Sequence, residues 1–93
     1  MKGNNLNDFI NDMYHNPEKE ICYRNKKYII NGFVDETGEL YTLAIYTVEE
    51  SSKTLFSYTS ENRGECVEQF EKAKIFGGRT IYEAEQDIEV VYG

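Results

Sequence analysis

Apolar positions near the start of the chain repeat with the period of a helix. The spacing i, i+3, i+4, i+7 is occupied by Leu6, Phe9, Ile10 and Met13. Residues at this spacing share one helical face, Asn4 or Asn5 can serve as the N-cap, and Pro17 closes the segment. The pattern predicts a short N-terminal helix with one packed side.

The middle of the chain instead alternates between apolar and polar positions, which is typical of half-buried strands. Turn residues divide it into four predicted strands, covering residues 21–24, 27–34, 40–48 and 54–59. Asn25 and Lys26 leave a gap of hairpin length between the first two strands. Residues 35–38 end in Gly38, where a turn with positive φ is expected, and residues 49–53 turn the chain again.

A second helix is predicted to start near Ser60. Its apolar arc consists of Cys66, Val67, Phe70 and Ala73. Three carboxylates, those of Glu61, Glu65 and Glu68, fall on the opposite, solvent-facing side together with Lys72.

The last third of the chain contains the expected end of the second helix and the expected start of a third. Gly77 and Gly78 suit the C-terminal end of the second helix. Thr80 and Glu83 have the T-x-x-E spacing of a capping box, so a further helical turn or two is expected before Asp87. Residues 88–92 are apolar and β-branched, and are expected to form a last strand on the sheet or along its edge.

These elements predict a single α+β domain over residues 1–93. The expected architecture is an antiparallel β-meander of about four strands, packed by an N-terminal helix and a C-terminal helix pair, in the order α-β-β-β-β-α-α-β. A chain of 93 residues, of which 40% are hydrophobic, can bury one core. It has no apolar run long enough for a membrane span and no signal-peptide pattern, so a cytoplasmic protein is expected.

The excess of acid lies entirely in the later part of the chain. Residues 1–34 carry 4 acids and 5 bases, whereas residues 35–93 carry 13 acids and 5 bases, for a net charge of −7 overall. Such crowding of like charges lowers the stability of a compact state, but it favours association with a basic partner.

Catalytic and metal-binding patterns are not found. His15, the single histidine, follows a polar helix face, where its simplest role is favourable contact with the helix dipole. Cys22 and Cys66 lack a nearby base or a second ligand, so both are interpreted as small packed hydrophobes. Residues 77–80 lack the spacing of a phosphate loop, and acid pairs such as Glu49-Glu50 lack the calcium-loop pattern. We therefore expect no enzyme activity, cofactor or metal.

Direct binding to nucleic acid is disfavoured, because the one basic cluster, Arg24, Lys26 and Lys27, lies at a hairpin tip of an acidic chain. The alternative is that this protein imitates a nucleic acid. Its carboxylates would then occupy a basic groove on another protein, in the place of phosphates. The candidate partner-binding residues are Asp35, Glu36, Glu39, Glu49, Glu50, Glu61, Glu65 and Glu68. The competing interpretation is that these acids only make the surface soluble.

Several segments resemble short acidic proteins of Firmicutes and their phages, namely residues 9–10, 21–30, 75–83 and 87–90. This resemblance covers most of the chain and implies origin and fold. Length, acidity and element order also resemble, more loosely, the small type II anti-CRISPR proteins that act as DNA mimics. That second resemblance implies a CRISPR effector nuclease, or another nucleic-acid-binding protein, as the partner.

The leading hypothesis is thus a non-enzymatic inhibitor from a mobile element that presents carboxylates to a basic surface of a host defence protein. Two alternatives remain open: an immunity protein that blocks a toxin, and an oligomerising structural or accessory domain. The sequence leaves the oligomeric state undetermined.

Overall fold

The computed structural model describes residues 1–48 and 53–93, and it has the predicted α+β architecture. The elements follow in the order α1 (Leu6–Met13), β1 (Lys19–Tyr23), β2 (Lys26–Val34), β3 (Tyr41–Thr47), β4 (Thr54–Ser60), α2 (Arg63–Lys72), α3 (Ile81–Ala84), the 3-10 helix η1 (Glu85–Asp87) and β5 (Ile88–Tyr92). The turn predicted over residues 49–53 falls almost wholly outside the described residues.

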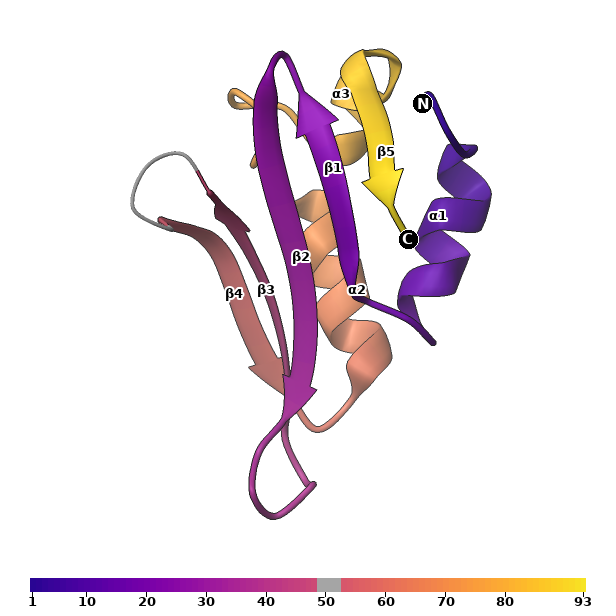
Figure 1. Cartoon of the computed structure of the whole chain (residues 1–93). Coiled ribbons are helices and arrows are strands. Elements are labelled where there is room, and N and C mark those ends of the chain that lie inside the picture. Colours follow the sequence, from indigo (N-terminus) through magenta and orange to yellow (C-terminus); the bar gives the residue numbers. More distant parts are fainter. Residues whose placement is uncertain (49–52) are drawn as a thin grey trace.

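The strands form one antiparallel sheet in the order β4-β3-β2-β1-β5 (Figure 1). Strands β1 to β4 make the predicted four-strand meander, and the sheet as a whole has five strands, because residues 88–92 join the sheet, one of the two placements expected for them. The C-terminal segment adds a fifth strand, which pairs with β1 so that Cys22 lies opposite Glu89. Beyond β5, Lys2 lies alongside in parallel, donating its backbone N–H to the carbonyl of Ile88 at 2.9 Å.

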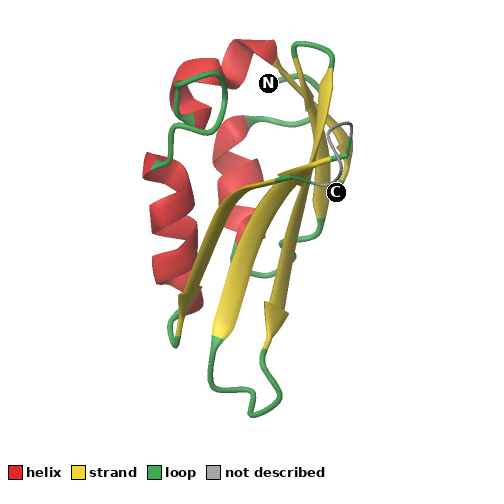
Figure 2. Cartoon of the chain, turned by 90° about the vertical axis from the view of Figure 1, so that its left-hand side faces the viewer, coloured by secondary structure: helices red, strands yellow, loops and turns green. Residues whose placement is uncertain are grey.

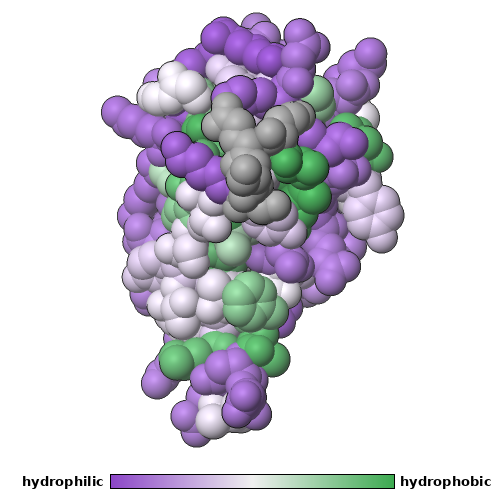
Figure 3. Space-filling model, turned by 60° about the vertical axis from the view of Figure 1, so that its left-hand side comes forward, coloured by the Kyte–Doolittle hydropathy of each residue, from purple (hydrophilic) through white to green (hydrophobic). Residues whose placement is uncertain are grey.

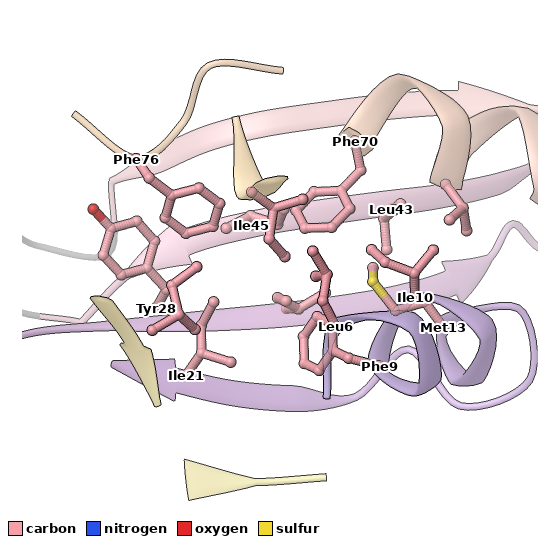
Figure 4. Close-up of a cluster of buried hydrophobic side chains, with 14 of the residues drawn as sticks. Leu6, Phe9, Ile10, Met13, Ile21, Tyr28, Leu43, Ile45, Phe70 and Phe76 are labelled. Carbon is pink, nitrogen blue, oxygen red and sulfur yellow. The ribbon is translucent and has the colours of Figure 1, made fainter. Parts of the chain in front are cut away.

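All helices lie on one face of the sheet, and the other face is left uncovered by them (Figure 2). The core forms between the two layers, where α1 contributes its predicted apolar face and the strands contribute alternate side chains (Figure 4). Phe9, Phe70 and Phe76 are among the largest side chains with no exposed surface. Because the helices form one layer and the antiparallel sheet forms the other, the domain is a two-layer α+β fold.

The first hairpin turns one residue earlier than predicted. Tyr23 pairs with Lys26, so the two turn residues are Arg24 and Asn25, with φ angles of 48° and 68°. Positive φ at both positions is the geometry that matches the twist of a two-residue hairpin. The prediction of an Asn25-Lys26 turn is therefore wrong, and Lys26 is the first residue of β2.

Helix α2 is shorter at both ends than predicted. Ser60 still belongs to β4, and Asn62 is the N-cap, its side chain accepting the backbone N–H of Gly64 at 2.8 Å. The helix ends at Lys72, so Ala73 is its C-cap and does not extend the buried arc. Gly77 and Gly78 do not end this helix; both have positive φ in a tight turn that Phe76 and Arg79 close.

The predicted capping box is confirmed. Thr80 accepts the backbone N–H of Glu83 at 3.3 Å, and the Glu83 carboxylate accepts the backbone N–H of Thr80 at 2.9 Å. This second bond holds the pKa of Glu83 below its usual value. Helix α3 and η1 then end at Asp87, as expected.

A buried lysine joins α1 to the sheet, which the sequence analysis missed. Lys19 on β1 has a side chain without exposed surface, and its Nζ donates to Asp12 Oδ2 at 2.7 Å. The same ammonium lies 5.2 Å from the ring centre of Phe9.

Both cysteines are free thiols, and burial raises the pKa of Cys66.

Candidate protein-binding surface

The turn between β2 and β3 is fixed by one of its own acids. Asp35 Oδ1 accepts from the Thr37 hydroxyl at 2.8 Å and from the backbone N–H of Glu39 at 3.2 Å. The bond from Thr37 is the main reason that the pKa of Asp35 lies below its usual value. Gly38 adopts the predicted positive φ, at 75°. Asp35 thus holds the turn, while Glu36 and Glu39 are exposed on it.

Apolar side chains lie directly beside these acids. Phe33 and Val34 at the end of β2 are each 53% exposed, and Leu40 before β3 is 39% exposed. The turn projects past the ends of the helices, so no helix covers this part of the sheet (Figure 2). Hydrophobic surface adjoins the hydrophilic end of the molecule in the space-filling view (Figure 3). We call residues 33–40 the hairpin end.

The acids of α2 begin at the same end of the molecule. Ser60 pairs with Tyr41, and Tyr41 pairs with Val34, so the junction between β4 and α2 lies near the hairpin end. Glu61 is exposed in this junction and precedes the helix, which corrects its predicted place on the helical face. Glu65 and Glu68 are exposed on the helix itself.

Glu65 also has a partner on the sheet. The hydroxyl of Tyr58 donates to Glu65 Oε1 at 2.6 Å, and this bond raises the pKa of Tyr58. Since a carboxylate has several lone pairs, Glu65 can still accept from a second donor on its exposed side. The bond fixes the direction of this carboxylate relative to β4.

The basic residue at the start of α2 turns away from these acids. Arg63 Nη1 donates to the backbone carbonyl of Tyr14 at 3.2 Å, and its guanidinium lies 4.5 Å from the ring centre of Tyr41. Salt bridges within the described part of the chain use other carboxylates, those of Asp12, Glu20, Glu85, Asp87 and Glu89. Among the described residues, the exposed acids Glu36, Glu39, Glu61, Glu65 and Glu68 therefore have no salt-bridge partner.

The predicted binding residues thus fall into three sets. Asp35, Glu36 and Glu39 lie together on the hairpin end, and Glu61, Glu65 and Glu68 continue from it onto α2. Glu49 and Glu50 lie outside the described residues. The sequence analysis missed the exposed apolar residues of the hairpin end, although two consecutive apolar residues, Phe33 and Val34, must face opposite sides of a strand.

Two residues of the basic cluster at the first hairpin, Arg24 and Lys27, contact carboxylates. Arg24 Nη2 lies 3.2 Å from Asp87 Oδ2, and Arg79 Nη1 lies 3.4 Å from the same oxygen. Lys27 Nζ lies 3.6 Å from Glu20 Oε1. The carboxylate of Asp87 therefore holds the β1–β2 turn against the end of η1.

Neither a metal centre nor a membrane span is found in the part of the chain that the structure describes. Over residues 1–48 and 53–93, no three side chains among His, Cys, Asp and Glu gather in a way that would hold a metal ion. Over the same residues, no helix combines the length and apolarity needed to cross a membrane. Comparison with protein-family models, curated proteins and solved structures finds no match for this chain.

Proposed function

We propose that this protein is a non-enzymatic inhibitor that binds a basic, nucleic-acid-binding surface of another protein. The observation that carries the proposal is the hairpin end, which combines exposed Phe33, Val34 and Leu40 with the charges of Glu36 and Glu39. Desolvated apolar anchors supply most of the affinity at protein interfaces, and charges around them supply specificity and a fast on-rate.

The acids of α2 extend this surface. Glu61, Glu65 and Glu68 are exposed, and Arg63, the base nearest to them in sequence, contacts Tyr14 and Tyr41 instead. A row of carboxylates beside an apolar anchor suits a groove that normally holds phosphates. A host defence protein such as a CRISPR effector nuclease has such a groove, and a mobile element is the expected source of an inhibitor.

The test begins with the partner, captured by the tagged protein from its native host and identified by mass spectrometry. Changing Glu61, Glu65 and Glu68 together to Gln should weaken its binding by roughly 2 to 5 kcal/mol, since buried charge pairs are lost. The matched control changes Asp8 to Asn and Glu18 and Glu89 to Gln, three exposed acids outside the proposed surface, which alters the net charge equally. Exposed pairs such as Glu89 with Lys2 contribute little to stability, so the control should fold and bind normally.

Apolar anchoring has a separate test. Phe33→Ser should weaken binding by at least about 1 kcal/mol with little change in the melting temperature, because this side chain is already 53% exposed. Asp35 is left intact in every variant, since it holds the turn. Affinity that stays at the wild-type value in both Phe33→Ser and the α2 triple variant, without competition by nucleic acid, would overturn the proposal.

One observation favours a second candidate, an oligomerising domain. The uncovered face of the sheet has a shallow hollow of about 360 Å³ whose lining includes Ile29, Tyr46 and Tyr92. Glu18, Glu20 and Asn31 also line this hollow, so it mixes polar groups with aromatic and aliphatic surface. Such a surface on an open sheet can accept another copy of the chain. Light scattering distinguishes the two: a stable dimer that Tyr46→Ser dissociates would favour this candidate, whereas a monomer favours the inhibitor.

A further inference from the structure

Strand β4 forms a free edge of the sheet. It is the last strand in the order β4-β3-β2-β1-β5, and among the described residues it pairs with β3 alone (Figure 1). The opposite edge differs, because Lys2 lies alongside β5 there. Edge strands usually carry charged residues or proline, which prevent pairing with other chains. The 7 residues of β4, Thr54–Ser60, include neither.

The hairpin that joins β2 to β3 shows how the backbone of β3 is directed. The N–H of Asp35 donates to the carbonyl of Leu40 at 2.9 Å, so these two residues form a hydrogen-bonded pair. Bonded and non-bonded pairs alternate along an antiparallel ladder. Thr42 and Ala44 therefore direct their backbone N–H and C=O groups toward β2.

The same alternation identifies the outward backbone groups of β4. Leu43, between the two β3 residues that face β2, directs its backbone groups toward Tyr58, its partner on β4. The neighbours of Tyr58 in the strand, Ser57 and Thr59, therefore direct their N–H and C=O groups away from β3. Both residues are exposed, and the irregular step of this ladder lies nearer the start of β4. The edge thus offers two donors and two acceptors to another strand.

A carboxylate lies beside this edge, on the helix side of the sheet. The hydroxyl of Tyr58 donates to Glu65 Oε1 at 2.6 Å, and Glu65 is exposed. Phe56 precedes Tyr58 by two residues and so lies on the same side, where its ring centre is 6.3 Å from that of Phe70 on α2. Aromatic surface and a negative charge therefore adjoin the outward backbone groups.

We infer that an extended segment of the partner pairs with β4 and places an Arg or Lys beside Tyr58. This inference rests on the proposed function and adds how the basic partner is held. The backbone of the segment bonds to Ser57 and Thr59, as in complexes that add a strand to a sheet edge. The residue opposite Tyr58 points to the helix side, because opposite residues of paired strands share a face. Its cationic group there contacts both the Glu65 carboxylate and the Tyr58 ring.

Charge favours a basic segment over a second copy of the chain. The net charge is −7, and because Glu65 lies beside β4, pairing of two β4 strands would bring two Glu65 carboxylates near each other. Like charges oppose such association, whereas a basic segment is attracted. Light scattering should therefore show a monomer. A dimer that Ser57→Pro dissociates would assign the edge to a second copy and overturn the inference.

The experiment uses a synthetic peptide, so that it does not depend on the partner. The probe is Thr-Val-Thr-Arg-Thr-Val-Thr with acetylated and amidated ends, titrated while the backbone amide signals of the protein are followed by NMR. Saturable shifts are expected at residues 57, 59 and 65, with a dissociation constant of about 1 mM or tighter.

Two altered peptides separate charge from backbone pairing. Replacing the arginine by glutamate should weaken binding at least about fivefold, because the new carboxylate faces Glu65. Replacing the two threonines that flank the arginine by proline should weaken it at least about tenfold, because their N–H groups are the donors to β4.

Variants of the protein locate the contact. Ser57→Pro removes an N–H that does not bond to β3, so the fold should survive while peptide binding falls at least about tenfold. Ser57→Ala keeps this N–H and should bind at least about fivefold more tightly than Ser57→Pro. Glu65→Gln still accepts from Tyr58 but loses the charge, and should bind about threefold more weakly than the wild type. Glu89→Gln removes the same charge on β5, at the other edge, and should bind as the wild type does.

Two results would overturn the inference. One is the absence of saturable shifts at residues 57 and 59 with the arginine peptide. The other is equal peptide binding by wild type, Ser57→Pro and Glu65→Gln. Glu65→Gln and the proline peptide keep the test decisive if Ser57→Pro does not fold.

The captured partner separates this inference from the proposed function. A partner that loses affinity for the α2 triple variant but binds Ser57→Pro as tightly as the wild type would refute the strand pairing and keep the inhibitor. Peptide binding at β4, together with a partner that is indifferent to the carboxylates of α2 and to Phe33→Ser, would refute the inhibitor and keep the edge as a binding site.

Discussion

Gly32 lies on β2 where the side chain of Tyr41 crosses the strand. A Cβ added at this glycine would lie 2.0 Å from the Tyr41 hydroxyl oxygen and 2.6 Å from Pro17 Cγ. Gly32→Ala should therefore destabilise the protein by about 1 to 3 kcal/mol, measured by denaturant unfolding, because the ring of Tyr41 must move. Combining it with Tyr41→Leu should cost less than the sum of the two single changes. Strict additivity would show that the ring does not limit this position.

Phe70 illustrates a residue whose role the sequence predicted. It is fully buried on α2, and its ring centre lies 6.3 Å from that of Phe56 on β4. Phe70→Ala should cost about 3 to 5 kcal/mol, because the contacts are lost and a cavity remains. That exceeds what many small domains can lose. Thermal unfolding within a degree or two of the wild type would contradict this packing.

The first hairpin makes a prediction at the scale of an element. Asn25 has a φ of 68°, so Asn25→Gly should leave stability unchanged or raise it by up to about 1 kcal/mol, since glycine adopts this conformation without strain. Lys26 is paired with Tyr23 in the sheet, so Lys26→Gly should lower stability by roughly 0.5 to 1 kcal/mol. Thermal melts of the two variants measure both effects. If Lys26→Gly were more stable than Asn25→Gly, the turn would instead consist of residues 25 and 26.

The same hairpin shows why periodicity located the elements but not every boundary. Asn favours positive φ whether it is the first or the second turn residue, so local preference alone did not separate the two possible turns. Contacts far along the chain accompany the observed one, since Arg24 pairs with Asp87 while Tyr23 packs against Phe76. The capping box of Thr80 was predictable because both of its partners are local.

For the proposed binding surface, the sequence predicted the charged residues but not the exposed apolar ones. Alternation assigns residues to the two faces of a sheet, but it does not tell where the covering helices end. Helix α2 starts at Arg63, after the chain has left the hairpin end, so Phe33 and Leu40 remain exposed. That arrangement depends on how the two layers are placed, which is a property of the whole fold.

At the scale of the whole molecule, two effects of pH oppose each other. The chain carries a net charge of −7 at pH 7, and its pI is about 4.6, so acidification first relieves the repulsion among its carboxylates. The carboxyls of Asp35 and Glu83 act the other way, because hydrogen bonds hold both pKa values below their ordinary 3.8 and 4.5. A lowered folded-state pKa stabilises the fold at pH above the ordinary value, and this stabilisation is lost as pH falls through the folded-state pKa.

The melting temperature should therefore rise as pH falls from 7, pass through a maximum near about pH 5, and decline below about pH 4. In about 1 M salt, where the Debye length is about 3 Å, the rise should shrink, because charges at the surface are already screened. Asp35→Asn removes one carboxyl whose protonation contributes to the decline, so its melting temperature should fall less steeply in acid than that of the wild type. Melts between pH 3 and 7 at constant ionic strength measure both the rise and the decline of the melting temperature. Two results would show that the hydrogen bonds of the β2–β3 turn do not stabilise the fold. One is a melting temperature that keeps rising below pH 4, and the other is a decline in Asp35→Asn that is as steep as in the wild type.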